Sequence, residues 1–288
     1  MTDADTGTPG ERRFVDLHMH STASDGALPP ADVIAAAARA GLAAIALTDH
    51  DTLAGVAEAR EAGDRAGVRV IAGVELSAVE PDGELHLLGL HLSNPGVMEG
   101  ELAAFREARR DRAGRIVERL NALGVPVTLE AVHREAGSGA IGRPHVARAL
   151  VAGGWARDLR DAFDRWLGNG RPAFVEKRHL SIADAIGLVH ASGGLAVYAH
   201  PGPGATRARL EALRALGLDG VEVRHPSHSA EDIARIGTLA DYLGLVPSGG
   251  SDWHGASDGP RTIGSMRVPG SWLDLQESRV RARREKVA

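Results

Sequence analysis

The stretch GGSDWHG at Gly249–Gly255 places an acid and an imidazole two residues apart, directly after the apolar run Leu243–Pro247. Four other apolar runs end in polar tips of the same kind: FVDLHMHS at 14–21, AAIALTDHD at 43–51, RVIAGVELS at 69–77 and GLAVYAHP at 194–201. Each run is typical of a buried strand, and catalytic groups in α/β barrels lie at the carboxyl ends of the strands. The five tips are therefore expected to form one site on the rim of a barrel.

Outward from these tips, strand patterns alternate with alanine-rich helical patterns, which predicts a parallel sheet. The first strands are expected over 13–19, 42–47 and 68–74, with helices over 30–40 and 55–66. The run 84–92 follows a PDG turn at 81–83 and is expected to form a hairpin with the strand before it. Later strands are expected over 195–199, 220–223 and 245–248. About seven strands in all favour an α/β barrel.

Composition divides the chain into four parts. Residues 1–12 are polar, contain no apolar core of a signal peptide and are expected to be a disordered leader. The barrel is expected over 13–93 and 178–270, interrupted by a mainly helical insertion or cap over 94–177. Residues 271–288 form a basic tail, whose segment RVRARREK is expected to fray.

The overall composition limits the class of protein. With 288 residues, 43% hydrophobic and 25% charged, the chain is typical of a soluble globular protein, and the cytoplasm is its expected location. A net charge of -5 and only 3% aromatic residues argue against binding of long nucleic acids. The absence of cysteine excludes thiolate ligands, so any metal must be bound by nitrogen and oxygen.

The tips carry the residue types that bind metals. His18 and His20 are two residues apart in a strand, so their side chains project the same way and can chelate one ion. Other candidates at strand ends are His50, Glu75, His200, Asp252 and His254. A single histidine at a strand end is more often a hydrogen-bonded structural residue, but the repetition of the pattern favours a metal site.

The motifs DLHMHSTASDG, ALTDHD, GVELS, VYAHP and GGSDWHG resemble those of the polymerase and histidinol phosphatase (PHP) family, over 14–92 and 193–255. The resemblance implies a distorted (β/α)7 barrel with three divalent metal ions, and a metal-bound water in place of a protein nucleophile. It assigns His18, His20, Glu75 and Asp252 to a first ion, Glu75, His86 and His200 to a second, and Asp25, His50 and His254 to a third.

Several neighbours of these residues are also histidines or acids. His91 lies five residues after His86 and would face the other side of a regular strand, so only one of the two is expected at the site. Asp16, Asp49 and Asp51 are expected to orient metal-bound imidazoles. The alternative is that these three acids only form hydrogen bonds at strand ends.

A set of imidazoles and carboxylates suits manganese, iron, zinc or cobalt, and manganese is the expected metal. Three divalent ions against the three carboxylates of Asp25, Glu75 and Asp252 would leave the site positively charged. Such a site attracts anions, and clustered divalent ions activate water and stabilise a phosphoryl group. Phosphate ester hydrolysis is therefore the expected chemistry.

The segment GRPH at 142–145 is the main indication of substrate. Arg143 and His145 precede the helical pattern VARALV, and a helix start beside an arginine is a good phosphate site. The resemblance is closest to a subgroup of nucleoside 3',5'-bisphosphate phosphatases and an exoribonuclease that trims 5' ends, and implies that Arg143, His145 and His228 bind phosphate. Lys177 is a weaker candidate. A capped helix start or a loop histidine is the alternative, and a surface role is favoured for Lys177 and His225.

The leading hypothesis is a hydrolase that removes a terminal phosphate or nucleotide from nucleoside bisphosphates or short 5'-phosphorylated RNA. No membrane or obligatory protein partner is expected. Histidinol phosphate phosphatase is an alternative within the fold, and a non-catalytic metal- or phosphate-binding module is an alternative of another class. The arginine-rich segment 105–121 is interpreted as a solvated helix rather than an RNA-binding one. Surface positions are expected for His133, His179 and His190.

Overall fold

The structure is a computed structural model that describes residues 14–80, 83–136, 141–176 and 180–287. Its contacts divide the chain into two compact units, Met1–Glu99 with Leu180–Ala288 and Gly100–His179. We call them the barrel unit and the helical unit. Composition placed the insertion at 94–177, close to these boundaries; its action as a cap stays a prediction.

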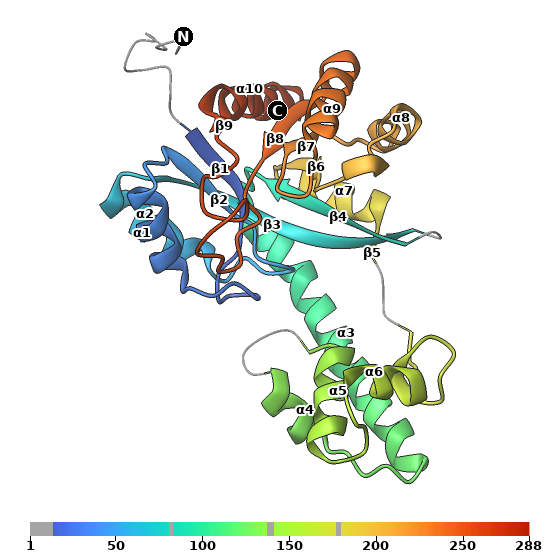
Figure 1. Cartoon of the computed structure of the whole chain (residues 1–288). Coiled ribbons are helices and arrows are strands. Elements are labelled where there is room, and N and C mark those ends of the chain that lie inside the picture. Colours follow the sequence, from blue (N-terminus) through green and yellow to red (C-terminus); the bar gives the residue numbers. More distant parts are fainter. Residues whose placement is uncertain (1–13, 81–82, 137–140, 177–179, 288) are drawn as a thin grey trace. The chain divides into compact units, whose positions relative to one another are not determined.

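The barrel unit is built on one sheet, in which eight strands follow one another in the order β8-β7-β6-β4-β3-β2-β1-β9 (Figure 1). These strands are β1 Phe14–Met19, β2 Ala44–Leu47, β3 Arg69–Glu80, β4 Gly83–Leu90, β6 Leu195–Tyr198, β7 Gly220–Arg224, β8 Val246–Gly249 and β9 Val268–Pro269. The short β5, Leu180–Ser181, pairs with β3 off this path.

Strand directions distort the barrel from a purely parallel one. β1, β2 and β3 are parallel, as are β6, β7 and β8, whereas β4 lies antiparallel between β3 and β6. The segment after β8 returns to β1, because the His20 N–H donates to the Trp253 carbonyl over 3.0 Å. The predicted distorted barrel and its β3–β4 hairpin are confirmed. Turn residues 81 and 82 lie outside the described part of the chain.

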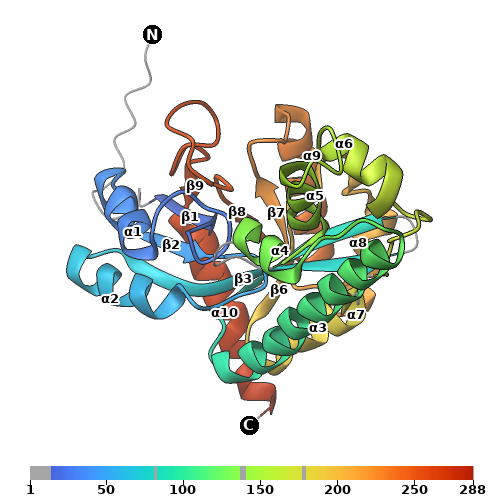
Figure 2. The same ribbon diagram turned by 90° about the horizontal axis from the view of Figure 1, so that it is seen from below.

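Helices cover the outside of the sheet (Figures 1 and 2). They are α1 Pro30–Arg39, α2 Val56–Ala66, α7 Ile182–Ala191, α8 Arg207–Ala215 and α9 Ala230–Leu243, with a 3-10 turn at Gly202–Gly204. Local sequence sets their ends: Ser229 caps α9 by accepting a hydrogen bond from the Asp232 N–H, and Gly244 ends it at a φ of 64°. No helix in the described ranges is long and apolar enough to cross a membrane.

The C-terminal segment is a helix, α10 Gly270–Val287. Val280 is buried with Leu195 and Val246, the first residues of β6 and β8, so α10 packs against the amino ends of strands. The prediction of a frayed tail is wrong for the described part of this segment. Its many arginines obscured the buried positions Leu273 and Val280, which are two helical turns apart and lie on one side of the helix.

Asp219 fastens α10 to the barrel. Its Oδ2 accepts hydrogen bonds from Arg283 of α10 at 2.9 Å, from the Ala196 N–H at 3.0 Å and from His190 Nε2 at 2.8 Å. The surface role expected of His190 is therefore wrong, since this ring is half-buried in a structural contact. Burial raises the pKa of Asp219, but the hydrogen bonds from His190, Ala196 and Arg283 outweigh it and lower the pKa.

Replacing Asp219 with asparagine is expected to destabilise the metal-free protein at pH 7 by about 1.5–3 kcal/mol, the typical worth of hydrogen bonds to a charged group. Because the folded-state pKa is lowered, this contribution is complete above the unfolded-state pKa of about 3.9 and disappears as the pH falls through the lower folded-state value. Urea unfolding at neutral and acidic pH measures it. Asp274→Asn, at an exposed position of α10, is the control. A cost that is equal at both pH values would refute the ionic role.

The helical unit contains α4 Leu129–Ala136, α5 Arg143–Ala152, α6 Leu159–Ala162, a π-helical turn Phe163–Leu167 and residues 100–122 of α3 Pro95–Ala122. Its core includes Ile116, Leu120, Val132, Leu150 and Leu167. Within α3, Arg112 donates to the Val175 carbonyl at 2.8 Å, and Arg119 donates to the Phe174 carbonyl. These two arginines anchor a loop, so the interpretation of the segment as merely solvated is incomplete.

Candidate metal centre

Glu75 lies at the middle of the rim and is 1% exposed. Its Oε2 is 3.1 Å from His18 Nε2 and 3.2 Å from His20 Nε2. Its Oε1 is 2.8 Å from His86 Nδ1 and 3.0 Å from His200 Nε2. The two oxygens of one carboxylate therefore face different imidazoles, with His50 Nδ1 also 3.4 Å from Oε2, so each oxygen could bind a separate ion.

Strand geometry explains how the pairs form. His18 and His20 project from the end of β1 on the same side, whereas Met19 between them packs in the apolar core. His86 pairs with Ser77 in the β3–β4 register, so it shares a face with Glu75, two residues before Ser77. His91 lies beyond the end of β4, and its Nε2 is 3.0 Å from Gln276 Oε1 of α10. The structure thus brings His86, and not His91, to the cluster.

The stretch GGSDWHG brings Asp252 close to His18 and His20. Asp252 Oδ1 lies 3.4 Å from His18 Nε2 and 3.3 Å from His20 Nε2. A Cβ on Gly250 would lie 2.5 Å from the His18 backbone nitrogen, so only glycine allows this close approach of the loop to β1. Burial raises the pKa of Asp252, but the neighbouring rings of His20 and His225 outweigh it and hold the pKa well below its usual range.

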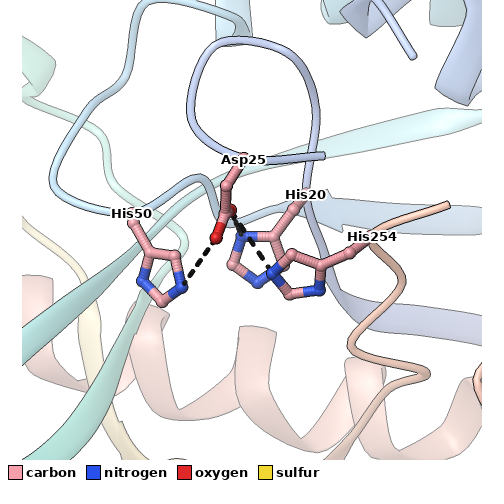
Figure 3. Close-up of side chains that lie close together, drawn as sticks. All are labelled: His20, Asp25, His50 and His254. Carbon is pink, nitrogen blue, oxygen red and sulfur yellow. Dashed lines mark ion pairs between the residues drawn. The ribbon is translucent and has the colours of Figure 1, made fainter. Parts of the chain in front are cut away.

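A third group surrounds Asp25, as Figure 3 shows. Asp25 Oδ1 is 3.3 Å from His254 Nε2, and Asp25 Oδ2 is 3.9 Å from His50 Nε2. His20 also belongs to this group, with Nδ1 3.8 Å from Asp25 Oδ1. Burial raises the pKa of Asp25, but the hydrogen bond from His254 and the charge of His50 prevail and lower the pKa to about 2.

The residues fit metal ions chemically. Both ring nitrogens of His20 are buried and have no hydrogen-bond partner, although carboxylate oxygens lie close to them. Unpaired buried polar atoms are costly, and a coordinated cation would satisfy them. Three groups of candidate ligands offer atoms close enough to share an ion: His18, His20, Glu75 and Asp252; Glu75, His86 and His200; and His20, Asp25, His50 and His254. In the described part of the chain, His18, Glu222 and His225 form a fourth group of this kind. All nine candidate ligands are in these groups.

Glu222 is a buried carboxylate behind the cluster that sequence reasoning missed. Its Oε1 lies 3.1 Å from His18 Nδ1, and its Oε2 accepts the His200 N–H at 2.7 Å. Burial raises the pKa of Glu222, but the charge of His18 outweighs it and lowers the pKa. A carboxylate on the far nitrogen of a metal-binding histidine fixes the orientation of the ring. The sequence signal was an acid between two valines in the strand run GVEVR.

His225 corrects the expectation of a surface residue, because it is 2% exposed. The Ser227 N–H donates to His225 Nδ1 at 3.1 Å, so the proton is on Nε2, which donates to Asp252 Oδ2 at 3.3 Å. The ring therefore holds a candidate ligand in place. Its position in the loop after β7 gave no indication of this contact, which depends on the fold.

Two of the flanking acids, Asp16 and Asp49, bind backbone N–H and hydroxyl groups. Asp16 accepts from the Ser251 and Gly264 N–H groups, each at 2.9 Å, and so ties down both ends of the loop that contains Asp252. Asp49 accepts from the Ser21 N–H at 2.7 Å. These contacts match the alternative of hydrogen-bonded strand ends. Asp51 follows His50 at a φ of 51°, and an orienting role for it stays a prediction.

The candidate phosphate-binding residues have local partners. Arg143 donates to the Leu167 carbonyl and to Asn169 Oδ1, each at 3.2 Å. His145 Nδ1 accepts the Gly142 N–H at 2.9 Å and so caps α5. Phosphate binding by Arg143 and His145 stays a prediction. Lys177 and His179 lie outside the described residues.

His228 is buried, with both ring nitrogens bonded to backbone groups. Its Nε2 accepts the Gly202 N–H at 3.0 Å, and its Nδ1 donates to the Val223 carbonyl at 2.9 Å. This pattern leaves no ring N–H to donate to a phosphate. It supports a structural role for His228, in place of the phosphate contact expected from the sequence.

An α/β barrel whose rim gathers imidazoles and carboxylates within ligand distance is a metal-binding barrel, the class that this fold and site define. The PHP domain family matches residues 16–169. A 3',5'-nucleoside bisphosphate phosphatase of Chromobacterium violaceum is 38% identical over 258 residues, which are 87% of this chain and 90% of that protein. The 5'-3' exoribonuclease Rnm of Escherichia coli is 39% identical over 83% of this chain and 84% of its own.

Two further comparisons also match proteins described as acting on phosphate esters. A phosphoribosyl 1,2-cyclic phosphate 1,2-diphosphodiesterase of Eggerthella lenta is 37% identical over 88% of this chain and 98% of its own. A solved structure from Bifidobacterium adolescentis, described as a metal-dependent phosphoesterase, has a TM-score of 0.72 and 34% identity, over 93% of this chain and 96% of its own. The chain belongs to the PHP family and is a phosphoesterase, which confirms the resemblance seen in its motifs.

Proposed function

We propose that the protein uses three divalent metal ions to remove a terminal phosphate or nucleotide from nucleoside 3',5'-bisphosphates or short 5'-phosphorylated RNA. Manganese is the proposed metal. The position of Glu75 carries this proposal, because its two oxygens face separate sets of histidines. One carboxylate can then join two ions, and the group around Asp25 supplies a third position. Iron and zinc are the alternatives to manganese, since both accept nitrogen and oxygen ligands.

The chain's own residues have defined tasks in this proposal. The imidazoles and carboxylates of the three groups hold the ions, which supply an activated water and neutralise charge on the phosphoryl group. Glu222 and His225 orient His18 and Asp252 from behind. Because the three carboxylates only partly neutralise three divalent ions, the rim attracts an anionic substrate. No protein nucleophile is required.

The nucleotide class of substrate is supported by the names of two relatives and by the segment Gly142–His145. We propose that Arg143 binds the phosphate that is not transferred. Its guanidinium lies 5.7 Å from the centre of the Phe163 ring and 5.5 Å from that of Phe174, so aromatic faces help to hold it. A cytoplasmic location follows from the same proposal, since nucleotides and RNA ends are found there.

A panel of substrates tests the proposal. The metal-reloaded protein is offered adenosine 3',5'-bisphosphate, a short 5'-phosphorylated RNA, histidinol phosphate and a ribose 1,2-cyclic phosphate, and phosphate or mononucleotide release is measured. We expect the first two to be hydrolysed with the highest kcat/KM. Preference for histidinol phosphate or for the cyclic phosphate would contradict the proposed substrate while leaving the phosphoesterase class intact.

Arg143→Ala is expected to lower kcat/KM for the bisphosphate about tenfold or more, the worth of one charge-assisted contact, and to spare p-nitrophenyl phosphate, which lacks a second phosphate. Steady-state kinetics on both substrates measure this. Arg148→Ala is a matched control, because Arg148 lies on the same helix and pairs with Glu135. Equal losses on both substrates would remove Arg143 from the specificity role.

A further inference from the structure

Arg261 lies at the metal centre, although no motif in the sequence pointed to it. Its Nη1 contacts Asp252 Oδ2 and lies 3.4 Å from the Asp252 carbonyl oxygen. The side chain is 46% exposed, so it also faces solvent. A cation is thus placed beside a candidate metal ligand, on the open side of the rim.

The two oxygens of Asp252 have different neighbours. Oδ1 faces Nε2 of His18 and His20, the side on which an ion would bind. Oδ2 accepts from His225 Nε2 at 3.3 Å and from Arg261. Oδ1 can therefore bind an ion without any change at Arg261, and the Asp252–Arg261 contact is compatible with a loaded centre.

Nη1 of Arg261 makes both the contact with Asp252 Oδ2 and the contact with the Asp252 carbonyl oxygen. Within the described part of the chain, its Nε and Nη2 have no hydrogen bond to a protein group. A guanidinium has five N–H donors in a fixed planar fork, so anchoring through Nη1 leaves the Nε and Nη2 side available. That side matches two oxygens of a phosphate group.

The loop that carries Arg261 is fixed at both ends. Asp16, which is fully buried within β1, accepts hydrogen bonds from the N–H groups of Ser251 before the loop and of Gly264 after it. Arg224 also donates to the Met266 carbonyl at 3.3 Å. The barrel therefore holds both ends of the loop, and the contact with Asp252 holds the guanidinium beside the candidate metal centre.

We propose that Arg261 binds the phosphoryl group that is transferred, with Nη1 on Asp252 and with Nε and Nη2 on phosphate oxygens. This inference rests on the proposed function for the nature of the substrate, and it adds a phosphate-binding residue within the barrel. Its role differs from that of Arg143, because Arg261 contacts the group common to every phosphate ester. Hydrolysis of any phosphate monoester, or of a terminal phosphodiester, is therefore expected to depend on Arg261.

Binding of orthophosphate to manganese-loaded protein, followed by calorimetry, tests the proposal without requiring turnover. Arg261→Gln is expected to weaken orthophosphate binding about tenfold or more at unchanged metal content. Arg261→Lys keeps the charge but loses the fork, so partial recovery is expected. Arg39→Gln, at an exposed position of α1, is the matched control and is expected to bind orthophosphate as the wild type does.

Two results would overturn the assignment. Unchanged orthophosphate affinity in Arg261→Gln would remove the residue from phosphate binding. Loss of metal in step with loss of orthophosphate would show that Arg261 only holds Asp252. In steady-state kinetics, Arg261→Gln should lower kcat/KM by the same factor for p-nitrophenyl phosphate and for the bisphosphate. If the wild type hydrolyses no ester, the proposed function fails, and orthophosphate binding still decides the role of Arg261.

Discussion

His20→Ala is expected to lose metal from the centre and to lose phosphoesterase activity by more than about 100-fold, beyond the effect typical of a residue that only supports a ligand. His20 belongs to two of the three groups, with Nε2 directed toward Glu75 and Asp252 and Nδ1 toward Asp25. Its removal therefore affects both groups at once. Elemental analysis of metal content and hydrolysis of p-nitrophenyl phosphate measure the two losses.

A stability measurement separates this effect from unfolding. In the metal-free protein, the buried ring nitrogens of His20 have no hydrogen bond, so little polar interaction is lost on replacement. The rise in Tm that metal binding gives the wild type should be reduced or absent in the variant, because fewer ions bind the folded state. His133→Ala, at an exposed position of the helical unit, is the control. Wild-type metal content in His20→Ala would contradict its assignment as a ligand.

Glu222→Gln is expected to lower metal affinity or activity about 10- to 100-fold, as is usual when the partner of a metal-bound histidine is changed. Glutamine fills the same space and its carbonyl can still accept the His200 N–H, but it brings no charge to His18. The fold should therefore survive. Chelator competition measures metal affinity and urea unfolding checks stability.

Glu211→Gln on α8 is the matched control for Glu222, because Glu211 is 45% exposed and pairs with Arg207, and neither residue is in the candidate metal centre. It should change neither metal affinity nor kinetics. If Glu222→Gln binds metal as tightly as the wild type and keeps full activity, the buried carboxylate has no orienting role. A loss of folding alone, with normal affinity in the folded fraction, would lead to the same conclusion.

The sequence predicted the barrel and the gathering of the candidate ligands because both follow from local patterns. Residues two apart on a strand share a face, and the carboxyl ends of parallel strands meet on one rim. His18, His20 and Glu75 could be placed by these rules alone. His86 was assigned from the resemblance to the PHP family, and its antiparallel pairing on β3 explains why it reaches the site.

What the sequence did not predict depends on contacts between distant segments. Glu222 is one acid in a valine-rich strand, and its role appears only when the fold brings its carboxylate to His18. His225 and Arg261 meet Asp252 through loops whose course is set by Asp16 and by the close approach of Gly250. The α10 helix was missed because its apolar positions are few and are separated by arginines.

The central claim is that Glu75 joins ions in a centre that hydrolyses phosphate esters. The most direct measurement titrates Mn²⁺ into metal-stripped protein and follows, in one series of samples, the number of ions bound and the release of phosphate from adenosine 3',5'-bisphosphate. We expect hydrolysis to rise only as more than one ion binds per chain, and to stay at background in Glu75→Gln. Full occupancy without phosphate release, or full activity with a single ion, would contradict the account.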